Sequence, residues 1–138
     1  MIEAVFIIHH GVCLFSRQYS KIGLEKNLFS SFITAINQFA TQISGVGLSK
    51  FIVGDSIFSL SLINNILFVY KHEDLKASKL EKISNSISNR FLELFNIDFS
   101  KWDGEITMFQ KFGDETDKIL LMKGREIGAK MHDFALRF

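Results

Sequence analysis

The sequence contains few of the residues that mark secreted or linker-rich proteins. Among its 138 residues there is one cysteine, Cys13, and no proline. A lone cysteine cannot form a disulfide within the chain, which fits a reducing compartment. No Pro-rich linker, internal repeat or low-complexity segment marks a domain boundary. We therefore expect an intracellular, cytoplasmic protein built as one domain.

Neither sign of charge dominates. The chain has 16 basic and 15 acidic residues, mixed along its length, for a net charge of +1. Nucleic-acid binders usually carry a concentrated basic patch, so we expect no nucleic-acid partner. No apolar run approaches the roughly 18 residues that span a bilayer, and the first residues lack the features of a signal peptide. We expect no transmembrane segment, and any membrane association would be peripheral.

Hydrophobic residues, in contrast, are plentiful. They make up 47% of the chain, and 15 of them are phenylalanine. A chain of this length buries roughly 68 to 70% of the surface that its unfolded form exposes. We therefore expect one bulky, Phe-rich core that needs no disulfide or metal to hold it.

The chain opens with a pattern typical of a β-hairpin. Residues 2–8 are apolar at both odd and even positions, which predicts a central strand buried on both faces. His9, His10 and Gly11 suit a tight reversal, and residues 12–19 continue as a second, more polar strand.

Three more strands are predicted further along, at residues 48–53, 56–62 and 66–71. Gly54-Asp55 and Asn64-Asn65 suit the connections, because these residue types tolerate left-handed backbone conformations. A meander of antiparallel strands is the simplest interpretation. The last of the three is apolar on both faces and should also be central.

Helical spacing separates these two groups of strands. Apolar residues recur every three or four positions between Leu24 and Ile43, which predicts an amphipathic helix whose stripe is widened by Phe29, Ile33 and Ala40. The stripe consists of Leu24, Leu28, Phe32, Ile36, Phe39 and Ile43. A second helix is predicted for residues 74–95; Ser78 with Glu81 matches a capping box, although Asp74 could start the helix one turn earlier. A short third helix is predicted with Asp114 as its N-cap and Gly124 as its end.

This order of elements resembles that of longin domains, which occur in R-SNAREs, clathrin-adaptor small subunits, sedlin-type TRAPP subunits and the signal-recognition-particle receptor. The likeness is greatest in the apolar opening strand, Gly11, and the segment Leu14 to Tyr19. It covers roughly residues 1–122. The roadblock family is a neighbour in fold, but its members usually begin with a helix, whereas here a strand comes first.

The resemblance implies an α/β (α+β) fold with a five-stranded antiparallel sheet in the order 2-1-5-4-3. The first helix would cover one face, and the second and third helices the other. Strands two and three would then be edges, whose unpaired backbone groups are available to another chain. We expect a longin-like domain at residues 1–124, without a SNARE motif, followed by a short amphipathic tail at residues 125–138. The tail places Ile127, Met131, Phe134 and Phe138 at helical spacing, and it could dock on the domain, a partner or a membrane.

The function implied by the resemblance is that of a non-enzymatic protein-interaction module. It would act as an adaptor or scaffold in vesicle trafficking or small-GTPase regulation, through a homo- or heterodimer. Its partners would be a small GTPase or coat or tethering components. The alternative is a small-molecule sensor, because related sheets of PAS-like and profilin-like type hold a ligand between sheet and helix.

No sequence motif for catalysis is present: there is no glycine-rich phosphate loop, serine-nucleophile motif or His-Glu-x-x-His. We therefore expect no catalytic residues and no cofactor. His9, His10 and Cys13 form the one cluster of soft metal ligands. Neighbouring strand residues point to opposite faces, so the two histidines should diverge unless the turn reorients one of them. We interpret them as turn histidines beside a partly buried cysteine, and expect no metal.

The most informative surface is predicted on the first helix, whose outer face is polar but almost uncharged. Depletion of charge is typical of the centre of an interface, although a general bias toward Ser and Asn gives the same pattern. We therefore predict a partner surface on this helix and the neighbouring edge strand. Its candidate residues are Asn27, Phe29, Ser30, Ile33, Thr34, Asn37, Phe51 and Val53.

Overall fold

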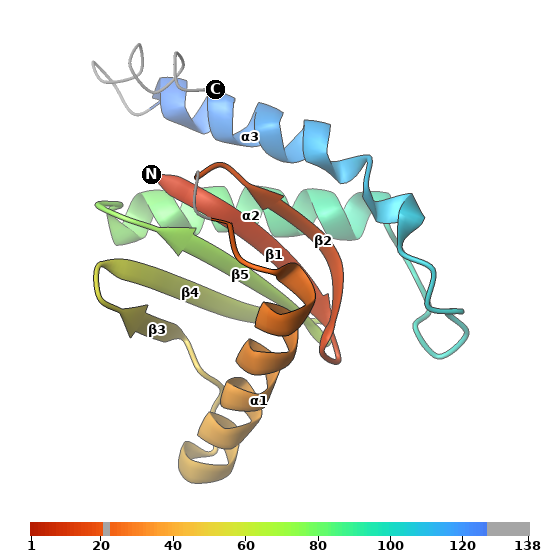
Figure 1. The fold of residues 1–138 in the computed structure, drawn as a ribbon. Helices are drawn as coiled ribbons and strands as arrows, with labels where there is room; N and C mark the ends of the chain where they lie inside the picture. Colours follow the sequence, from red (N-terminus) through yellow and green to blue (C-terminus); the bar gives the residue numbers. More distant parts are fainter. Residues whose placement is uncertain (21–22, 127–138) are drawn as a thin grey trace. The chain divides into compact units, whose positions relative to one another are not determined.

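A computed structural model describes residues 1–20 and 23–126, with side chains described as far as Met122. The chain divides into two compact units, Met1–Leu75 and Lys76–Phe138. The first contains the sheet and one helix, and the second contains the remaining helices (Figure 1).

The first unit is built on a five-stranded sheet. Its strands are β1 (Ile2–His9), β2 (Val12–Gln18), β3 (Lys50–Val53), β4 (Ser56–Ile63) and β5 (Ile66–His72). They lie in the order β2-β1-β5-β4-β3, and every neighbouring pair is antiparallel. The predicted sheet is therefore confirmed, with strand ends that fall within a residue or two of the expected ones.

Two tight turns explain why the sequence specified this sheet so well. Between β1 and β2, His10 and Gly11 have φ angles of 46° and 82°; between β4 and β5, Asn64 and Asn65 have φ angles of 53° and 63°. Paired positive φ angles are typical of two-residue hairpin turns, whose twist matches that of the strands. Gly and Asn accept this conformation at low cost, which fixes the register of both hairpins.

The strands expected at the centre of the sheet are the buried ones. Every residue of β1 except Glu3 is buried, and so is every residue of β5 except Lys71. This burial agrees with their positions inside the sheet order and confirms the prediction made from their unbroken apolar sequence.

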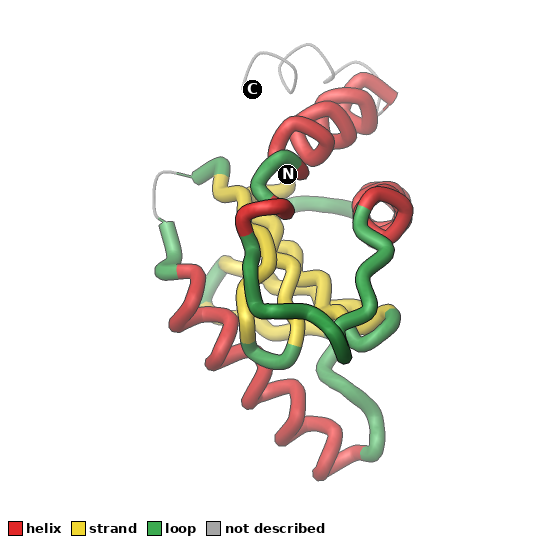
Figure 2. Tube along the Cα trace, turned by 90° about the vertical axis from the view of Figure 1, so that its right-hand side faces the viewer, coloured by secondary structure: helices red, strands yellow, loops and turns green. Residues whose placement is uncertain are grey.

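Helix α1 (Lys26–Ser44) lies on one face of the sheet (Figure 2). It begins at Glu25, whose carboxylate accepts hydrogen bonds from the backbone N–H groups of Asn27 and Leu28 at 3.2 and 2.6 Å. It ends at Gly45, which has a φ of 78° and donates its N–H to the Thr41 carbonyl. Phe29 and Ile33 pack into a core shared with the sheet, where they meet Ala4, Phe6, Ile8, Phe58, Leu60, Leu67 and Val69.

The apolar stripe of α1 is split between core and solvent. Phe29 and Ile33 are 9% and 0% exposed, whereas Leu28, Phe32, Phe39 and Ile43 are 72%, 47%, 59% and 70% exposed. At about 100° per residue, the exposed group lies on a flank roughly a quarter-turn or more from Ile33. Both Figure 1 and Figure 2 show the C-terminal end of α1 lying beyond the strands, so the sheet cannot cover the C-terminal part of that flank.

The second unit contains α2 (Ala77–Leu94), a short 3-10 helix at Thr107–Phe109, and α3 (Phe112–Glu126). Aromatic rings form its core: Phe91 lies 4.9 Å from Phe95, 5.7 Å from Phe109 and 5.2 Å from Phe112, measured between ring centroids. The Arg90 guanidinium on α2 forms an ion pair with the Glu115 carboxylate on α3 at 3.2 Å.

Two details of these helices correct the sequence predictions. The expected capping box of Ser78 and Glu81 is wrong, because α2 begins after Lys76 and no side chain caps it. Helix α3 starts two residues earlier than predicted and continues through Gly124 to Glu126. The placement of α2 and α3 on the second face of the sheet stays a prediction. The predicted helical spacing of the tail falls on residues 127–138, outside the described part of the chain.

Candidate functional site: an apolar groove beside the edge strand

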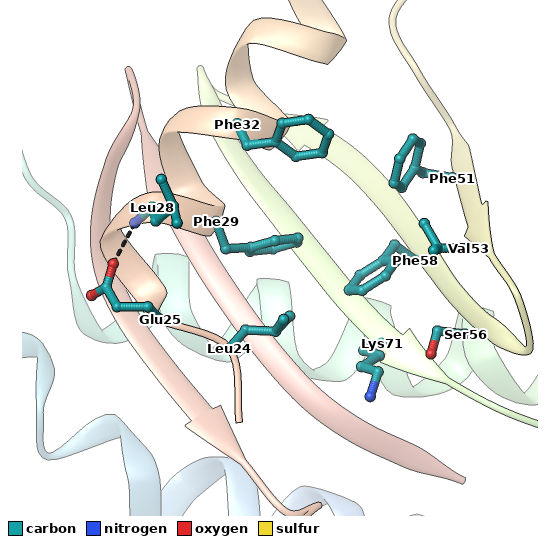
Figure 3. A pocket seen from close by; sticks show the side chains of 10 residues that line it. All are labelled: Leu24, Glu25, Leu28, Phe29, Phe32, Phe51, Val53, Ser56, Phe58 and Lys71. Carbon is teal, nitrogen blue, oxygen red and sulfur yellow. Dashed lines mark hydrogen bonds between the residues drawn. The ribbon is translucent and has the colours of Figure 1, made fainter. Parts of the chain in front are cut away.

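A groove with a volume of about 560 Å³ opens in the first unit between the N-terminal half of α1 and strands β3, β4 and β5 (Figure 3). Most of the side chains that line it are apolar: Leu24, Leu28, Phe29, Phe32, Phe51, Val53 and Phe58. Glu25, Ser56 and Lys71 contribute the polar atoms.

Phenylalanine rings form a connected row along this groove. Phe29 of α1 lies 4.6 Å from Phe6 and 5.2 Å from Phe58, and Phe58 lies 6.2 Å from Phe51, between ring centroids. Phe32 meets Phe51 edge-on at 5.8 Å. Aromatic pairs at such distances are mutually stabilising, so the floor of the groove is held in place by its own packing.

The charged groups at the groove already have partners within the unit. The Glu25 carboxylate caps α1, and the Lys71 ammonium lies 3.2 Å from Oε2 of Glu3. The latter contact is an ion pair without hydrogen-bond alignment, since this oxygen has no hydrogen-bond partner among the described residues. The groove is therefore close to neutral, which favours an occupant that brings an apolar group.

An exposed apolar line extends along α1 from this groove. Leu28, Phe32, Phe39 and Ile43 share one flank of the helix, and Phe32 contacts Phe51 of β3. We call these four residues, with Phe51 and Val53, the α1–β3 surface. Scattered apolar side chains are normal on a protein surface, but a contiguous set usually marks a place where something binds.

Two of the predicted partner-surface residues line this site in accessible positions. Phe51 is half-buried and Val53 is exposed, both in β3 and both at the groove. Phe29 also lines the groove, but as part of its buried floor. Three of the predicted residues, Phe29, Phe51 and Val53, thus line the groove, and partner binding there stays a prediction.

The remaining predicted residues lie elsewhere on α1. Ser30 and Ile33 are fully buried against the sheet, so their assignment to an accessible surface is corrected. Ser30 donates its hydroxyl to the Lys26 carbonyl, and Thr34 donates its own to the Ser30 carbonyl. Asn37 Oδ1 accepts from the backbone N–H of Leu48 at 2.7 Å, which ties α1 to the segment leading into β3. Asn27 is exposed.

The residues that sequence reasoning missed are Leu28, Phe32, Phe39 and Ile43 as surface groups. Their spacing carried a signal, because positions 28, 32, 39 and 43 form a line of their own beside the line of Phe29 and Ile33. The sequence could not show which of the two lines faces the sheet.

His9, His10 and Cys13, the predicted cluster of soft ligands, make separate contacts in the structure. The rings of His9 and His10 stack at 4.0 Å, because the turn conformation of His10 brings the two side chains together instead of apart. His9 Nδ1 lies 3.2 Å from the Asn65 carbonyl oxygen. Buried Cys13 donates its thiol to the Phe15 carbonyl, and burial raises the pKa of this thiol. Within the described residues, no three His, Cys, Asp or Glu side chains gather as metal ligands.

A hydroxyl and an imidazole meet outside the groove. Ser59 Oγ lies 2.8 Å from His72 Nε2, a geometry that nucleophilic enzymes also use. His72 is only 4% exposed, and its Nδ1 has no hydrogen-bond partner in the part of the chain that the structure describes. Because neither residue lines the groove, we interpret the pair as a buried structural hydrogen bond.

No family model matches the chain, and no curated protein matches its sequence. Of the helices described, none combines the length and apolar character needed to span a membrane. The groove and the α1–β3 surface are therefore the features from which we infer a function.

Proposed function

We propose that the chain is a non-enzymatic protein-interaction module of longin type that binds partners through its α1–β3 surface. The longin assignment is supported by the sheet order β2-β1-β5-β4-β3 and by α1 on one face of the sheet. The interaction role is carried by one observation: the apolar flank of α1 stands exposed instead of packing on its own sheet.

The chemistry of this surface is that of a protein interface. The centres of such interfaces are apolar, depleted of charge and enriched in aromatic residues, and a few anchors supply most of the binding energy. Phe32 and Phe39 are the natural anchors here, and burying a side chain of this size contributes about 1.5 to 3 kcal/mol at most.

The role that follows from the longin assignment is that of an adaptor or scaffold in vesicle trafficking or small-GTPase regulation. The partners would be a small GTPase or coat or tethering components, and the working form a homo- or heterodimer. The protein would act in the cytoplasm, with peripheral membrane association through its partners. The neutral groove supports partners that insert apolar side chains, because both of its charged residues are already engaged.

Binding to purified partners tests this proposal. We would measure binding of small GTPases in both nucleotide states, and of coat and tethering components, by isothermal titration calorimetry. We expect one of these classes to bind, and Phe39→Lys with Ile43→Lys to weaken the binding at least tenfold. The matched control is Gln38→Lys with Thr41→Lys, which adds the same charge to the same turns of α1 on the polar side.

Circular dichroism should show that both double variants retain the fold, since all four positions lie at or near the surface. The proposal would be overturned if no candidate class bound the wild-type protein. It would also be overturned if the two double variants bound equally well.

A small-molecule sensor is the second candidate, and the groove itself favours it. Its volume of about 560 Å³ falls within the range of known ligand sites, roughly 300 to 1,000 Å³, and its lining is mostly aromatic and aliphatic. Thermal-shift screening against apolar metabolites tests this candidate. A ligand that raises the melting temperature by several degrees in the wild-type protein, but not in Val53→Trp, would favour the sensor.

A further inference from the structure

We propose that the groove binds a free fatty acid, whose carboxylate lies at Lys71 and Ser56 and whose alkyl chain follows the phenylalanine row toward Phe32. The inference rests on the second candidate function, the sensor, because it names the ligand class of the same groove. It is carried by two hydrogen-bond donors without acceptors at one end of the groove and by the aromatic lining of the rest.

The two donors come from neighbouring strands on the same face of the sheet. Lys71 of β5 is the direct partner of Phe58 on β4, and Ser56 lies two residues before Phe58 on β4. Diagonal neighbours of this kind lie roughly 7 to 8 Å apart, a distance that a long side chain can span. Both Lys71 and Ser56 line the groove (Figure 3). One end of the groove therefore holds an ammonium and a hydroxyl together.

Neither donor has an acceptor in the part of the chain that the structure describes. The Lys71 ammonium lies 3.2 Å from Oε2 of Glu3, but this oxygen has no hydrogen-bond partner there, so the contact balances charge without using an N–H group of the lysine. No other described group accepts from Lys71 or from the Ser56 hydroxyl. The Lys71 side chain is only 14% exposed, and buried donors without acceptors are costly. A ligand that brings an acceptor would remove this cost.

A carboxylate is the acceptor that suits this pair of donors. Its two oxygens can accept from the ammonium and the hydroxyl at once, and hydrogen bonds to a charged group are shorter and stronger than neutral ones. The lysine has three N–H donors, so it can bond a ligand and still balance the charge of Glu3. An aromatic side chain inserted by a protein partner would fill the apolar part of the groove but leave both donors without acceptors.

The remainder of the groove suits an alkyl chain. Lys71, Phe58 and Phe51 follow one another as direct partners across β5, β4 and β3. From α1, Phe29 packs 5.2 Å from Phe58 and Phe32 packs 5.8 Å from Phe51, between ring centroids. A single chain laid from Lys71 to Phe32 would contact aromatic rings along its length, and the apolar area buried there would drive binding.

Three amphiphiles with the same alkyl chain test the chemistry of the head. Decanoate, decanol and decylammonium would be titrated into the protein below their micelle concentrations and followed by isothermal titration calorimetry. We expect decanoate to bind at one site, at least tenfold more tightly than decanol, and decylammonium to bind most weakly because Lys71 repels it. The inference is overturned if decanoate does not bind, or if either of the other two binds as tightly.

A double substitution tests the role of Lys71. Lys71→Met with Glu3→Gln removes the ammonium and also its partner's charge, so that no buried carboxylate is left alone. Decanoate should bind this variant at least tenfold more weakly, whereas decanol should bind it about as well as the wild-type protein. A merely structural role for the ion pair would affect both ligands alike. Unchanged binding of decanoate would overturn the placement of the carboxylate.

A matched pair of valine substitutions tests the location of the chain. Val53→Trp fills the groove and should abolish decanoate binding. Val12→Trp is the control, because Val12 is also an exposed strand residue, 44% against 57% for Val53, but does not line the groove. Nuclear Overhauser contacts between bound decanoate and the rings of Phe32 and Phe51 would locate the chain directly. Equal binding by the two valine variants would overturn the inference.

The failure of this inference is distinguishable from the failure of the functions proposed above. A protein that ignores decanoate, but is stabilised by another apolar metabolite unless Val53→Trp is present, would refute the fatty acid and retain the sensor. A protein that binds no small molecule, but binds a GTPase or a coat or tethering component, would refute both the fatty acid and the sensor while retaining the interaction role.

Discussion

A pair of identical substitutions in one helix tests which flank of α1 belongs to the core. Ile33→Ala and Ile43→Ala remove the same atoms from α1, but Ile33 is fully buried against the sheet and Ile43 is 70% exposed. The sequence pattern places both within one broad apolar stripe. The structure predicts that only the first is costly.

The expected difference is large. Truncation of a buried isoleucine to alanine costs about 2 to 5 kcal/mol, from lost burial and the cavity left behind. Ile33 sits in the centre of the core between α1 and the sheet, so we expect about 3 kcal/mol. Surface substitutions usually stay within about 0.5 kcal/mol, and the higher helix propensity of alanine offsets part of any loss at Ile43.

Urea unfolding followed by far-ultraviolet circular dichroism measures this difference. With a slope of about 2 kcal/mol per molar urea, typical of a small protein, Ile33→Ala should lower the midpoint by about 1.5 M and Ile43→Ala by less than about 0.3 M. Equal losses in the two variants would refute the placement of α1.

Three further outcomes follow from particular contacts. Glu25→Ala removes the N-cap of α1 and should cost about 1 kcal/mol of unfolding free energy in the same urea assay. Phe109→Ala empties the centre of the second unit's aromatic cluster and should cost about 3 to 5 kcal/mol, seen as an early loss of helical signal on heating. Burial, followed by the charge of the N-terminal ammonium group, lowers the pKa of His72, so the unfolded chain takes up the proton first as the pH falls. Stability should therefore be lost as the pH drops from about 6.5 through the lower folded-state pKa, and His72→Gln should flatten this dependence in urea unfolding measured over the same pH range.

The sheet could be predicted from the sequence because its determinants are local. Residues 2–8 and 66–71 are apolar on both faces, and no other position in a five-stranded sheet suits such strands as well as the centre. The Asn64-Asn65 turn and the turn at Gly11 then fix the two hairpins that contain these strands. The strand order followed from the resemblance to longin domains, and it agrees with this burial.

The site could be predicted only in part, because it depends on how α1 sits on the sheet. Two apolar lines run along α1, and the choice between Ile33 and Phe39 as the core residue depends on the position of the helix relative to strands far away in the sequence. Of the predicted partner-surface residues, Phe51 and Val53 line the groove, whereas Ser30 and Ile33 lie on the buried side of α1; partner binding stays a prediction. The capping box at Ser78 failed for a related reason, since a matching local motif does not decide where a helix begins once tertiary packing acts.

The sealed environment of Cys13 has a practical consequence. Its thiol is buried and donates a hydrogen bond to the Phe15 carbonyl, and burial raises its pKa, which keeps it in the neutral form. We therefore expect it to react slowly with maleimides and nitroxide reagents. A cysteine introduced at any exposed position would then take up a fluorophore or spin label selectively, without prior removal of the natural one. Distances between two chosen positions of the molecule can therefore be measured by fluorescence or spin-label spectroscopy.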